Sequence, residues 1–413
     1  MYKERHDCRI CGGSLTTVID LGNLHVSTFV ESDKEVPKVP MTLMVCKDCE
    51  LVQLKHTING DVMYREYWYK SGLNGKMVKA LQNVVHSIDE LHRVEDSIWV
   101  DIGSNDNTLL KYVKEMYKDS VTTVGFDPTL MDRHPVDFFV NDYFNADRYD
   151  ELLATKADVV TMIACFYDLE DPNGFLTQIK RILRKDGVFV IQMMDLESMW
   201  RLRDFANICH EHLEYYSLKV LNNLMNKHGL QIFDVEYNDV NGGSLRAYIQ
   251  YTTGAPSETV QEALRHEEEY FSSLEPDMFT WFRNEVSSQA HKIHKFFEWA
   301  EQTGKTVAVF GASTKGNTIL QYYGLDYTVI DHAAEVNSDK FGLKTVGTHI
   351  PIVSQVESLK SKPDYYFVLP YGFIDFFIDE HSEYLRTGGK FLVCMPEPAV
   401  IWWDGLGAQW TNL

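Results

Sequence analysis

The sequence has no long apolar run and little positive charge. None of its apolar stretches approaches the ~20 residues that cross a bilayer, and the first ten residues, MYKERHDCRI, lack the apolar segment of a signal peptide. Its 39 lysines and arginines are outnumbered by 60 aspartates and glutamates, which gives a net charge of −21 without a compensating basic stripe. These absences predict a cytoplasmic protein with no membrane partner and no nucleic acid partner.

The composition and length are those of a folded protein with several domains. Hydrophobic residues make up 45% and charged residues 24% of the 413 positions, which is ordinary for globular chains. The chain is longer than the ~100 to 200 residues of a typical domain, so we expect more than one core. The predicted segments are residues 1–60, 61–254, 255–303 and 304–413.

Four of the seven cysteines form two C-x-x-C pairs, CRIC and CKDC, separated by 34 residues. Two thiolates three positions apart fit adjacent corners of a tetrahedron, and two such pairs close a structural Zn²⁺ site with no place for water. Free thiols in a reducing compartment and a redox pair are the alternatives, but neither explains two matched pairs. The predicted zinc ligands are Cys8, Cys11, Cys46 and Cys49.

Strand-like and helix-like segments alternate over residues 61–254 and again over 304–413. The strand candidates are SIWVDIG, TTVGFD, ADVVTMIA and GVFVIQMM in the first segment, and KTVAVFGAS, YTVIDHA, DYYFVLP and GKFLVCMP in the second. Such alternation predicts parallel sheets covered by helices. Residues 255–303 have apolar positions at helical spacing and little glycine or proline, so they are expected to form a helical connector. The predicted fold class is α/β, with an N-terminal zinc-binding module.

The loop after the first strand, DIGSNDN, points to S-adenosylmethionine as a ligand. Asp127 ends the next strand in VGFDP, where an acid holds ribose hydroxyls in doubly wound sheets. The single glycine, Gly103, is weak evidence for a dinucleotide site, whereas Asp101 suits a ligand that carries an ammonium group. A simple tight turn is the alternative. The predicted cofactor-binding residues are Asp101, Gly103, Asn105, Asp127, Pro128 and Ser71.

Six segments carry a resemblance to a known family. In chain order they are DIGSNDN, FDP, CFYDLEDP, ICHEHLEYYS, NDVNGGSLR and GASTKGNTIL. Over nearly the whole chain they resemble the sugar C-methyltransferases that act on nucleotide-linked 4-keto-6-deoxyhexoses. The resemblance implies a zinc module, a central Rossmann-like class I methyltransferase domain that uses S-adenosylmethionine, and a C-terminal Rossmann-like α/β domain that helps to hold the nucleotide sugar.

Three interpretations compete for the sequence His210-Glu211-His212. Metal ligation needs further ligands, and the spacing is not that of a helical metal motif. Packing in a polar core is the ordinary role of a buried histidine. In the third interpretation, an imidazole with a pKa near ~6.5 removes a proton next to a ketone while a carboxylate orients it. The family resemblance implies this third role, with His212 as the base and Glu211 beside it.

C-methylation also needs a donor for the oxyanion of the enolate. Tyr67 and Tyr69 in YREYWYKSGLN are candidates, because the resemblance implies that this segment reaches over the active site. Packing is an equal alternative for these aromatic side chains. We predict Tyr69 as the third catalytic residue, after His212 and Glu211.

Two further motifs offer groups for a nucleotide sugar. NGGSLR suits hydroxyls or phosphate, unless it is a β-turn with a surface ion pair. GASTKGN places amides and a lysine at a strand-to-helix turn, where they could hold a diphosphate unless the domain is only a scaffold. The predicted substrate-binding residues are Tyr67, His210, Asn241, Ser244, Arg246, Lys315 and Asn317.

Three positions depart from the family pattern. Asn107 stands where glycine is expected, but asparagine tolerates a left-handed backbone. Asp168 stands where some relatives have histidine, which puts a second imidazole in doubt. Tyr371-Gly372 replaces an aromatic-histidine pair, which puts the identity of the substrate in doubt.

The sequence thus predicts an enzyme that transfers a methyl group to carbon 3 of a nucleotide-linked 4-keto-6-deoxy sugar. N-methylation or O-methylation on the same scaffold is one alternative. The other is a nucleotide-sugar-binding protein without catalysis, against which the intact HEH cluster argues. A monomer is expected.

Overall fold

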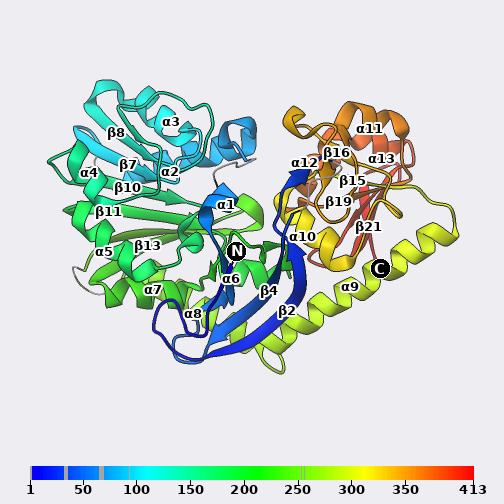
Figure 1. Ribbon diagram of the computed structural model, residues 1–413, viewed down its shortest axis with the longest axis horizontal. Helices are drawn as coiled ribbons and strands as arrows, with labels where there is room; N and C mark the ends of the chain where they lie inside the picture. The colour runs from blue at the N-terminus through cyan, green and yellow to red at the C-terminus, as the bar shows by residue number, and fades with distance from the viewer. Residues whose placement is uncertain (1, 32–35, 65–68, 93, 253, 255) are drawn as a thin grey trace.

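The computed structural model describes residues 2–31, 36–64, 69–92, 94–252, 254 and 256–413. Two α/β lobes lie side by side, with N-terminal strands between them and a long helix along the second lobe (Figure 1). We call residues 69–252 the first lobe and residues 304–413 the second. No helix in the described part of the chain has the length and apolarity needed to cross a membrane.

The first lobe is built on a seven-stranded sheet. Five neighbouring strands are parallel, in the order β11, β10, β7, β8 and β9. Beyond β11, the antiparallel hairpin of β14 and β13 forms the opposite edge of the sheet from β9. In spatial order the strands are β13 (Leu230–Asn238), β14 (Ser244–Tyr251), β11 (Leu183–Met193), β10 (Ala157–Ile163), β7 (Ser97–Ile102), β8 (Val121–Phe126) and β9 (Phe138–Val140).

Helices cover both faces of this sheet. Trp99 and Val121 belong to the core that α2 and α3 cover, whereas Val100 and Val124 belong to the core that α5 and α7 cover. Successive strand residues therefore alternate between two apolar cores, as expected for a buried parallel sheet. The helices are α2 (Gly75–Leu91), α3 (Thr108–Tyr117), α4 (Ala146–Leu152), α5 (Pro172–Ile182), α6 (Leu196–Arg201) and α7 (Leu218–Lys227).

The N-terminal module shares a sheet with the first lobe. Its strands β2 (Leu15–His25), β4 (Lys38–Cys46) and β5 (Val52–Leu54) are antiparallel, and β12 (Glu214–Tyr215) pairs with β5 as the fourth strand. The short helix α1 (Gly60–Tyr64) follows, and β1 (Tyr2–Glu4) pairs with β6 (His56–Ile58). The module also pairs β3 (Phe29–Val30) with β17 (Lys344–Thr345) of the second lobe, so it holds both lobes.

Two helices occupy the predicted connector, α8 (Glu258–Ser272) and α9 (Met278–Gln302). In α9 the buried side chains recur at helical spacing, from Phe282 and Val286 to Ile293 and Phe297. They belong to one apolar core with strands of the N-terminal module and of the second lobe. The helix therefore fixes the second lobe against the module.

The second lobe is another seven-stranded sheet. Five parallel strands are extended by two antiparallel strands at the C-terminus. Around them lie the helices α10 (Thr314–Tyr323), α11 (Gln355–Ser361), α12 (Ile374–Glu380) and α13 (Ser382–Arg386). In spatial order the strands are β18 (Ile352–Ser354), β16 (Ala333–Glu335), β15 (Val307–Phe310), β19 (Tyr365–Val368), β20 (Lys390–Val393), β21 (Ala399–Trp403) and β22 (Ala408–Asn412).

The predicted α/β class is confirmed, with one strand misplaced. The segment YTVIDHA was expected to be a strand, but residues 327–329 form a turn and β16 begins at Ala333. Asp326 accepts hydrogen bonds from the backbone and hydroxyl of Thr328, which stabilises the turn. A local side-chain bond thus outweighs the strand preference of this apolar segment.

Candidate functional site

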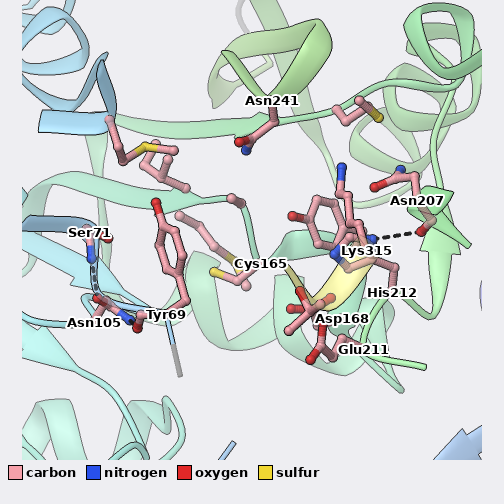
Figure 2. A pocket seen from close by; sticks show the side chains of 18 of the residues that line it. Tyr69, Ser71, Asn105, Cys165, Asp168, Asn207, Glu211, His212, Asn241 and Lys315 are labelled. Atoms are coloured by element: carbon pink, nitrogen blue, oxygen red, sulfur yellow. Dashed lines mark hydrogen bonds between the residues drawn. The ribbon is translucent and has the colours of Figure 1, made fainter. Parts of the chain in front are cut away.

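A cavity of about 470 Å³ opens at the carboxyl ends of β7, β8 and β10 and is closed on its far side by the second lobe (Figure 2). This is the edge at which open α/β sheets bind ligands. All nine predicted cofactor and catalytic residues line the cavity, together with two of the predicted substrate residues. Those that line it are Tyr69, Ser71, Asp101, Gly103, Asn105, Asp127, Pro128, Glu211, His212, Asn241 and Lys315.

The loop between β7 and α3 brings backbone to the cavity wall. Gly103 has a φ of +71°, and a Cβ there would lie 2.7 Å from the Cys165 sulfur. Only glycine is tolerated in so close an approach. Asn105 and Asn107 also have positive φ angles, 51° and 62°, so asparagine at 107 adopts the left-handed backbone expected of it.

Asp127 lies directly after β8 and is 4% exposed. Its Oδ2 accepts from the Asn105 amide and its Oδ1 from the Thr129 amide, both at 2.8 Å, and Arg133 Nη2 lies 3.3 Å from Oδ1. A carboxylate has about four lone-pair sites, so Oδ2 keeps acceptor capacity for a ligand hydroxyl.

Asp101, at the end of β7, is buried beneath the loop. Its Oδ1 accepts a hydrogen bond of 2.6 Å from the Thr161 hydroxyl. Burial raises the pKa of Asp101 to about 7, and the bond from Thr161 opposes that shift. A ligand cation next to this carboxyl would favour its ionised form.

A strap formed by residues 69–76 lies over the loop. Asn105 Oδ1 accepts from the Ser71 amide at 2.9 Å, and Asn105 Nδ2 donates to the Tyr69 carbonyl at 3.1 Å. The far end of the strap reaches the second lobe, where Lys76 Nζ donates to the Gly372 carbonyl at 3.4 Å. The strap therefore covers the cofactor end of the cavity and bridges the two lobes.

The second histidine of the HEH sequence has an unprotonated ring nitrogen at the cavity. His212 is half-buried, lines the cavity, and bonds through Nδ1 to the Asn207 carbonyl at 3.0 Å (Figure 2). A carbonyl only accepts, so Nδ1 carries the proton and Nε2 keeps its lone pair. Burial, together with the positive charge of Lys315, lowers the pKa of His212 to about 3. The ring is therefore a neutral base at neutral pH.

Two buried carboxyl groups lie below His212. Burial raises the pKa of Glu211 to about 7. Burial and the Glu211 charge raise the pKa of Asp168 well above its usual range. In its neutral form Asp168 can donate a hydrogen bond.

Glu211, His212 and Cys209 also form a cluster whose ligand atoms lie within 4.8 Å of one another. Burial raises the pKa of the Cys209 thiol well above its usual range, and the Lys315 ammonium acts on all three groups. A neutral thiol beside a fixed positive charge is a poor ligand for a cation. The cluster suits proton transfer better than metal binding.

Four residues predicted as substrate contacts do not line this cavity and bond to other parts of the protein instead. Arg246 is 1% exposed and donates to Gln192, Ser87, Glu236 and Asn83, so it joins the hairpin to α2. Asn317 donates to Ser27 and Thr28 and joins α10 to the N-terminal module. Ser244 donates to the Val240 carbonyl, and His210 bonds to the Val39 carbonyl.

One predicted substrate contact, Tyr67, lies outside the described residues. The departure at Tyr371-Gly372 has a steric explanation, because a Cβ on Gly372 would lie 3.0 Å from the Gly242 nitrogen. The backbones of the two lobes approach each other closely there, and a histidine side chain would crowd them.

Several residues of the cavity wall were not anticipated from the sequence. Tyr143 and Phe144 follow β9, and Asp204 and Asn207 precede the HEH segment. The sequence gives little indication of these residues. Asp204 is typical of a helix cap, and the pair Tyr143-Phe144 is typical of an apolar core. Only the folded chain brings them to the same wall.

The four cysteines of the N-terminal module have the arrangement that zinc requires. Their sulfur atoms all lie within 4.8 Å of one another, and the Cys8–Cys49 and Cys11–Cys46 contacts are 3.4 Å. Tetrahedral Zn²⁺ with bonds of about 2.3 Å needs sulfurs about 3.8 Å apart, so only small movements are required. The amides of Ile10, Gly13 and Asp48 donate to the sulfurs, as expected for thiolate ligands.

Comparisons with known proteins agree with this division of the chain. Residues 8–64 match the family model of a zinc binding domain, 76–235 that of a methyltransferase domain, and 239–396 that of the C-methyltransferase C-terminal domain. The C-methyltransferase NovU of Streptomyces niveus is 27% identical over 415 residues, which covers 96% of each chain.

Two solved structures are similar over part of the chain. One is the 1,6-didemethyltoxoflavin-N1-methyltransferase of Burkholderia thailandensis with S-adenosylhomocysteine, at 14% identity, TM-score 0.33, and coverage of 43% of this chain and 78% of that one. The other is an S-adenosylmethionine-dependent methyltransferase of Clostridium acetobutylicum, at 10% identity, TM-score 0.32, and coverage of 43% and 92%.

The three family models confirm the predicted fold class, with a zinc-binding module, a Rossmann-like methyltransferase domain and a C-terminal α/β domain. The methyltransferase match and the four-cysteine cluster likewise confirm S-adenosylmethionine and Zn²⁺ as the cofactors.

Proposed function

Because this chain belongs to the S-adenosylmethionine-dependent C-methyltransferases, we propose that its substrate is a nucleotide-linked 4-keto-6-deoxy sugar, methylated at carbon 3. Carbon becomes a nucleophile only after a neighbouring ketone has acidified its proton and a base has removed it. The proposal therefore requires a neutral base in the cavity, next to the place where the methyl group arrives.

The observation that carries the proposal is the state of His212. Its Nδ1 is bonded to a backbone carbonyl and its ring lines the cavity, so Nε2 keeps its lone pair on the cavity side. An unprotonated Nε2 is the group that proton abstraction needs. O-methylation or N-methylation would place less demand on such a base, since oxygen and nitrogen already carry lone pairs.

The cofactor end of the cavity supports binding of S-adenosylmethionine. Asp127 lies at the carboxyl end of β8 and keeps acceptor capacity on Oδ2 for a ribose hydroxyl. Asp101 is placed to face the amino acid ammonium, and the strap at Tyr69 and Ser71 covers the site. The bound cofactor supplies an electrophilic methyl group on a sulfonium.

In the proposed reaction, His212 Nε2 takes the proton from carbon 3, and Glu211 lies beside it in the cavity wall. Tyr69 lines the same cavity, and desolvation raises the pKa of its hydroxyl to about 12, so it stays a hydrogen-bond donor. Asn241 supplies an amide toward the sugar from the hairpin side. The strap and the second lobe exclude water from the enolate.

Deuterium exchange tests the proposal. The enzyme with S-adenosylhomocysteine and 4-keto-6-deoxyhexoses linked to UDP, dTDP, GDP or CDP would be incubated in D₂O and followed by NMR. One member of the panel is expected to exchange its carbon 3 proton, because the enolate forms but has no methyl group to accept. Exchange at carbon 5 would move the reaction to the other side of the ketone, and the absence of exchange across the panel would contradict enolate chemistry.

A further inference from the structure

The enolate needs a group that stabilises its oxyanion, and one cationic side chain lies beside the base. Lys315 is in the first turn of α10, where the Ser313 hydroxyl caps the helix by accepting from the Gly316 amide at 2.9 Å. The backbone of Lys315 is therefore fixed by the helix start. Its side chain enters the cavity from the second lobe next to His212 (Figure 2).

The surroundings leave the Lys315 ammonium available to a ligand. Its partner among the described residues is Asp204, whose Oδ2 lies 3.8 Å from Nζ, and this is long for an ion pair with a hydrogen bond. The Lys315 side chain is 31% exposed, on the cavity side. Glu211 and Asp168 offer little compensation, because both carboxyls have raised pKa values.

The position of Lys315 relative to the base decides which part of a substrate it meets. Its charge acts on His212, Glu211 and Cys209, three groups that lie within 4.8 Å of one another. In a 4-keto sugar, the proton that the base removes and the ketone oxygen are on adjacent carbons. The diphosphate is bonded to carbon 1, beyond carbon 2, so a cation beside the base meets the ketone first.

We propose that Lys315 is a further catalytic residue, whose ammonium donates a hydrogen bond to the 4-keto oxygen and stabilises the enolate oxyanion. This inference rests on the proposed function. It replaces the sequence-based expectation that Lys315 binds the diphosphate.

The carbon 3 proton passes to His212 Nε2, and the electrons of that C–H bond form the C3–C4 double bond. The electrons of the carbonyl double bond move to the oxygen, where Lys315 holds the negative charge. When carbon 3 bonds to the methyl group, the S–CH₃ electrons return to sulfur, the carbonyl re-forms, and imidazolium releases its proton to solvent.

The test compares Lys315→Met, Lys315→Arg and the control Lys305→Met. Lys305 pairs with Asp364 on the surface of the same lobe, so the control removes an equal charge outside the cavity. For Lys315→Met, kcat and the carbon 3 exchange rate are expected to fall together by roughly 10²- to 10³-fold, with KM changed by less than about threefold. Lys315→Arg should recover part of the loss, and Lys305→Met should behave as wild type.

A pH profile separates this role from a structural one. The charged and titratable groups around His212 are Glu211 and Cys209 on its own segment, Tyr167 and Asp168 from the short turn after β10, and Lys315 from α10 with its partner Asp204. The ring centroid of Tyr167 lies 4.3 Å from that of His212. Removing the positive charge of Lys315 raises the pKa of His212, so the acid limb of kcat/KM should move to higher pH in Lys315→Met. It should stay in place in Lys315→Arg, where the charge remains.

Each outcome bears on a different claim. Calorimetric binding of S-adenosylhomocysteine to each variant shows that it is folded. A KM that rises more than tenfold with an unchanged kcat would return Lys315 to the diphosphate and overturn the inference. Equal exchange rates in wild type and Lys315→Met would also overturn it. A wild-type enzyme that exchanges no member of the sugar panel would instead overturn the proposed function.

Discussion

The hydrogen bond between His212 and the Asn207 carbonyl assigns one tautomer to the imidazole, with Nδ1 protonated and Nε2 free. His212→Asn keeps a polar group that can reach the same carbonyl but has no basic nitrogen. We expect turnover to fall by roughly 10² to 10⁴, the usual contribution of a positioned base. Steady-state kinetics and carbon 3 exchange should fall in parallel.

The control is His228→Asn, a half-buried histidine of the same lobe that bonds to Asn173 away from the cavity and should leave turnover unchanged. Wild-type exchange in His212→Asn would mean that another residue is the base. Loss of sugar binding without loss of exchange chemistry would make His212 a positioning residue.

Asp127 is the residue on which cofactor affinity should depend. Asp127→Ala removes the acceptor for the ribose and leaves the Asn105 and Thr129 amides without their partner. We expect S-adenosylmethionine to bind more weakly by roughly 1 to 3 kcal/mol, which is the cost of unpaired buried polar groups. Isothermal calorimetry measures this directly. Asp137→Ala, which removes an acid bonded to Thr123 and Lys114, is the matched change outside the cavity, and equal losses in both variants would argue against a ribose contact.

Among the elements, strand β12 connects the zinc module to the HEH segment. Its pairing with β5 places Glu214 opposite Gln53, and the Leu54 amide also donates to the Leu213 carbonyl at 2.8 Å. The segment that carries His212 is therefore held by the sheet that the zinc ligands staple. Loss of zinc should loosen both.

Cys46→Ser tests this connection. We expect the variant to lose bound zinc and melt at a lower temperature, because three thiolates close the site poorly. Hydrogen exchange should become faster in residues 38–54 and also in 209–216. Normal metal content and melting would contradict the tetrathiolate site, and faster exchange confined to the module would mean that β12 does not transmit the change.

The same elements show what could be read from the sequence. Strands β7 and β8 were found because their apolar runs end in DIGSNDN and FDP, where local chemistry and fold agree. Strand β12 was missed because two residues carry no periodic pattern, and its pairing spans a large sequence separation. Arg246 was read as a ligand contact because its type suits phosphate, whereas its burial against α2 depends on tertiary packing. The zinc ligands needed only their spacing.

For the whole molecule, buried acids make stability depend on pH. Burial raises the pKa of Asp101, Glu211 and Glu267 to about 7 and that of Glu214 to about 8. An acid with a raised pKa binds its proton more tightly in the folded state, so stability is lost as pH rises from the unfolded pKa to the folded one. For these acids the loss runs from about pH 4 to about pH 8, and above about pH 6.5 unfolded histidines no longer bind protons and so no longer oppose it. We therefore expect the melting temperature to fall between about pH 6.5 and 8, as calorimetry in matched buffers would show.

The buried histidines do not alter this window. Burial lowers the pKa of His210 to about 4 and that of His212 to about 3. Histidines of this kind reduce stability as the pH falls below ~6.5, the pKa of a histidine in the unfolded chain. Above that pH they have no effect. Glu214→Gln should flatten the decline by on the order of 2 kcal/mol, since it removes one of the titrating groups. A melting temperature that rises above pH 7 would show that these carboxyls are ionised in the folded protein.

The pairing of β5 with β12 also governs how the protein is made. Leu54 and Glu214 are 160 positions apart, so at about 5 to 20 residues per second the ribosome needs roughly ten to thirty seconds to deliver the fourth strand after the third. During that interval the outer edge of β5 has no partner, which is a state that invites pairing with other chains. All four cysteine ligands, however, precede residue 50. Zinc can therefore close the nascent three-stranded sheet early and keep its edge in register until the strand beside the HEH segment emerges from the exit tunnel.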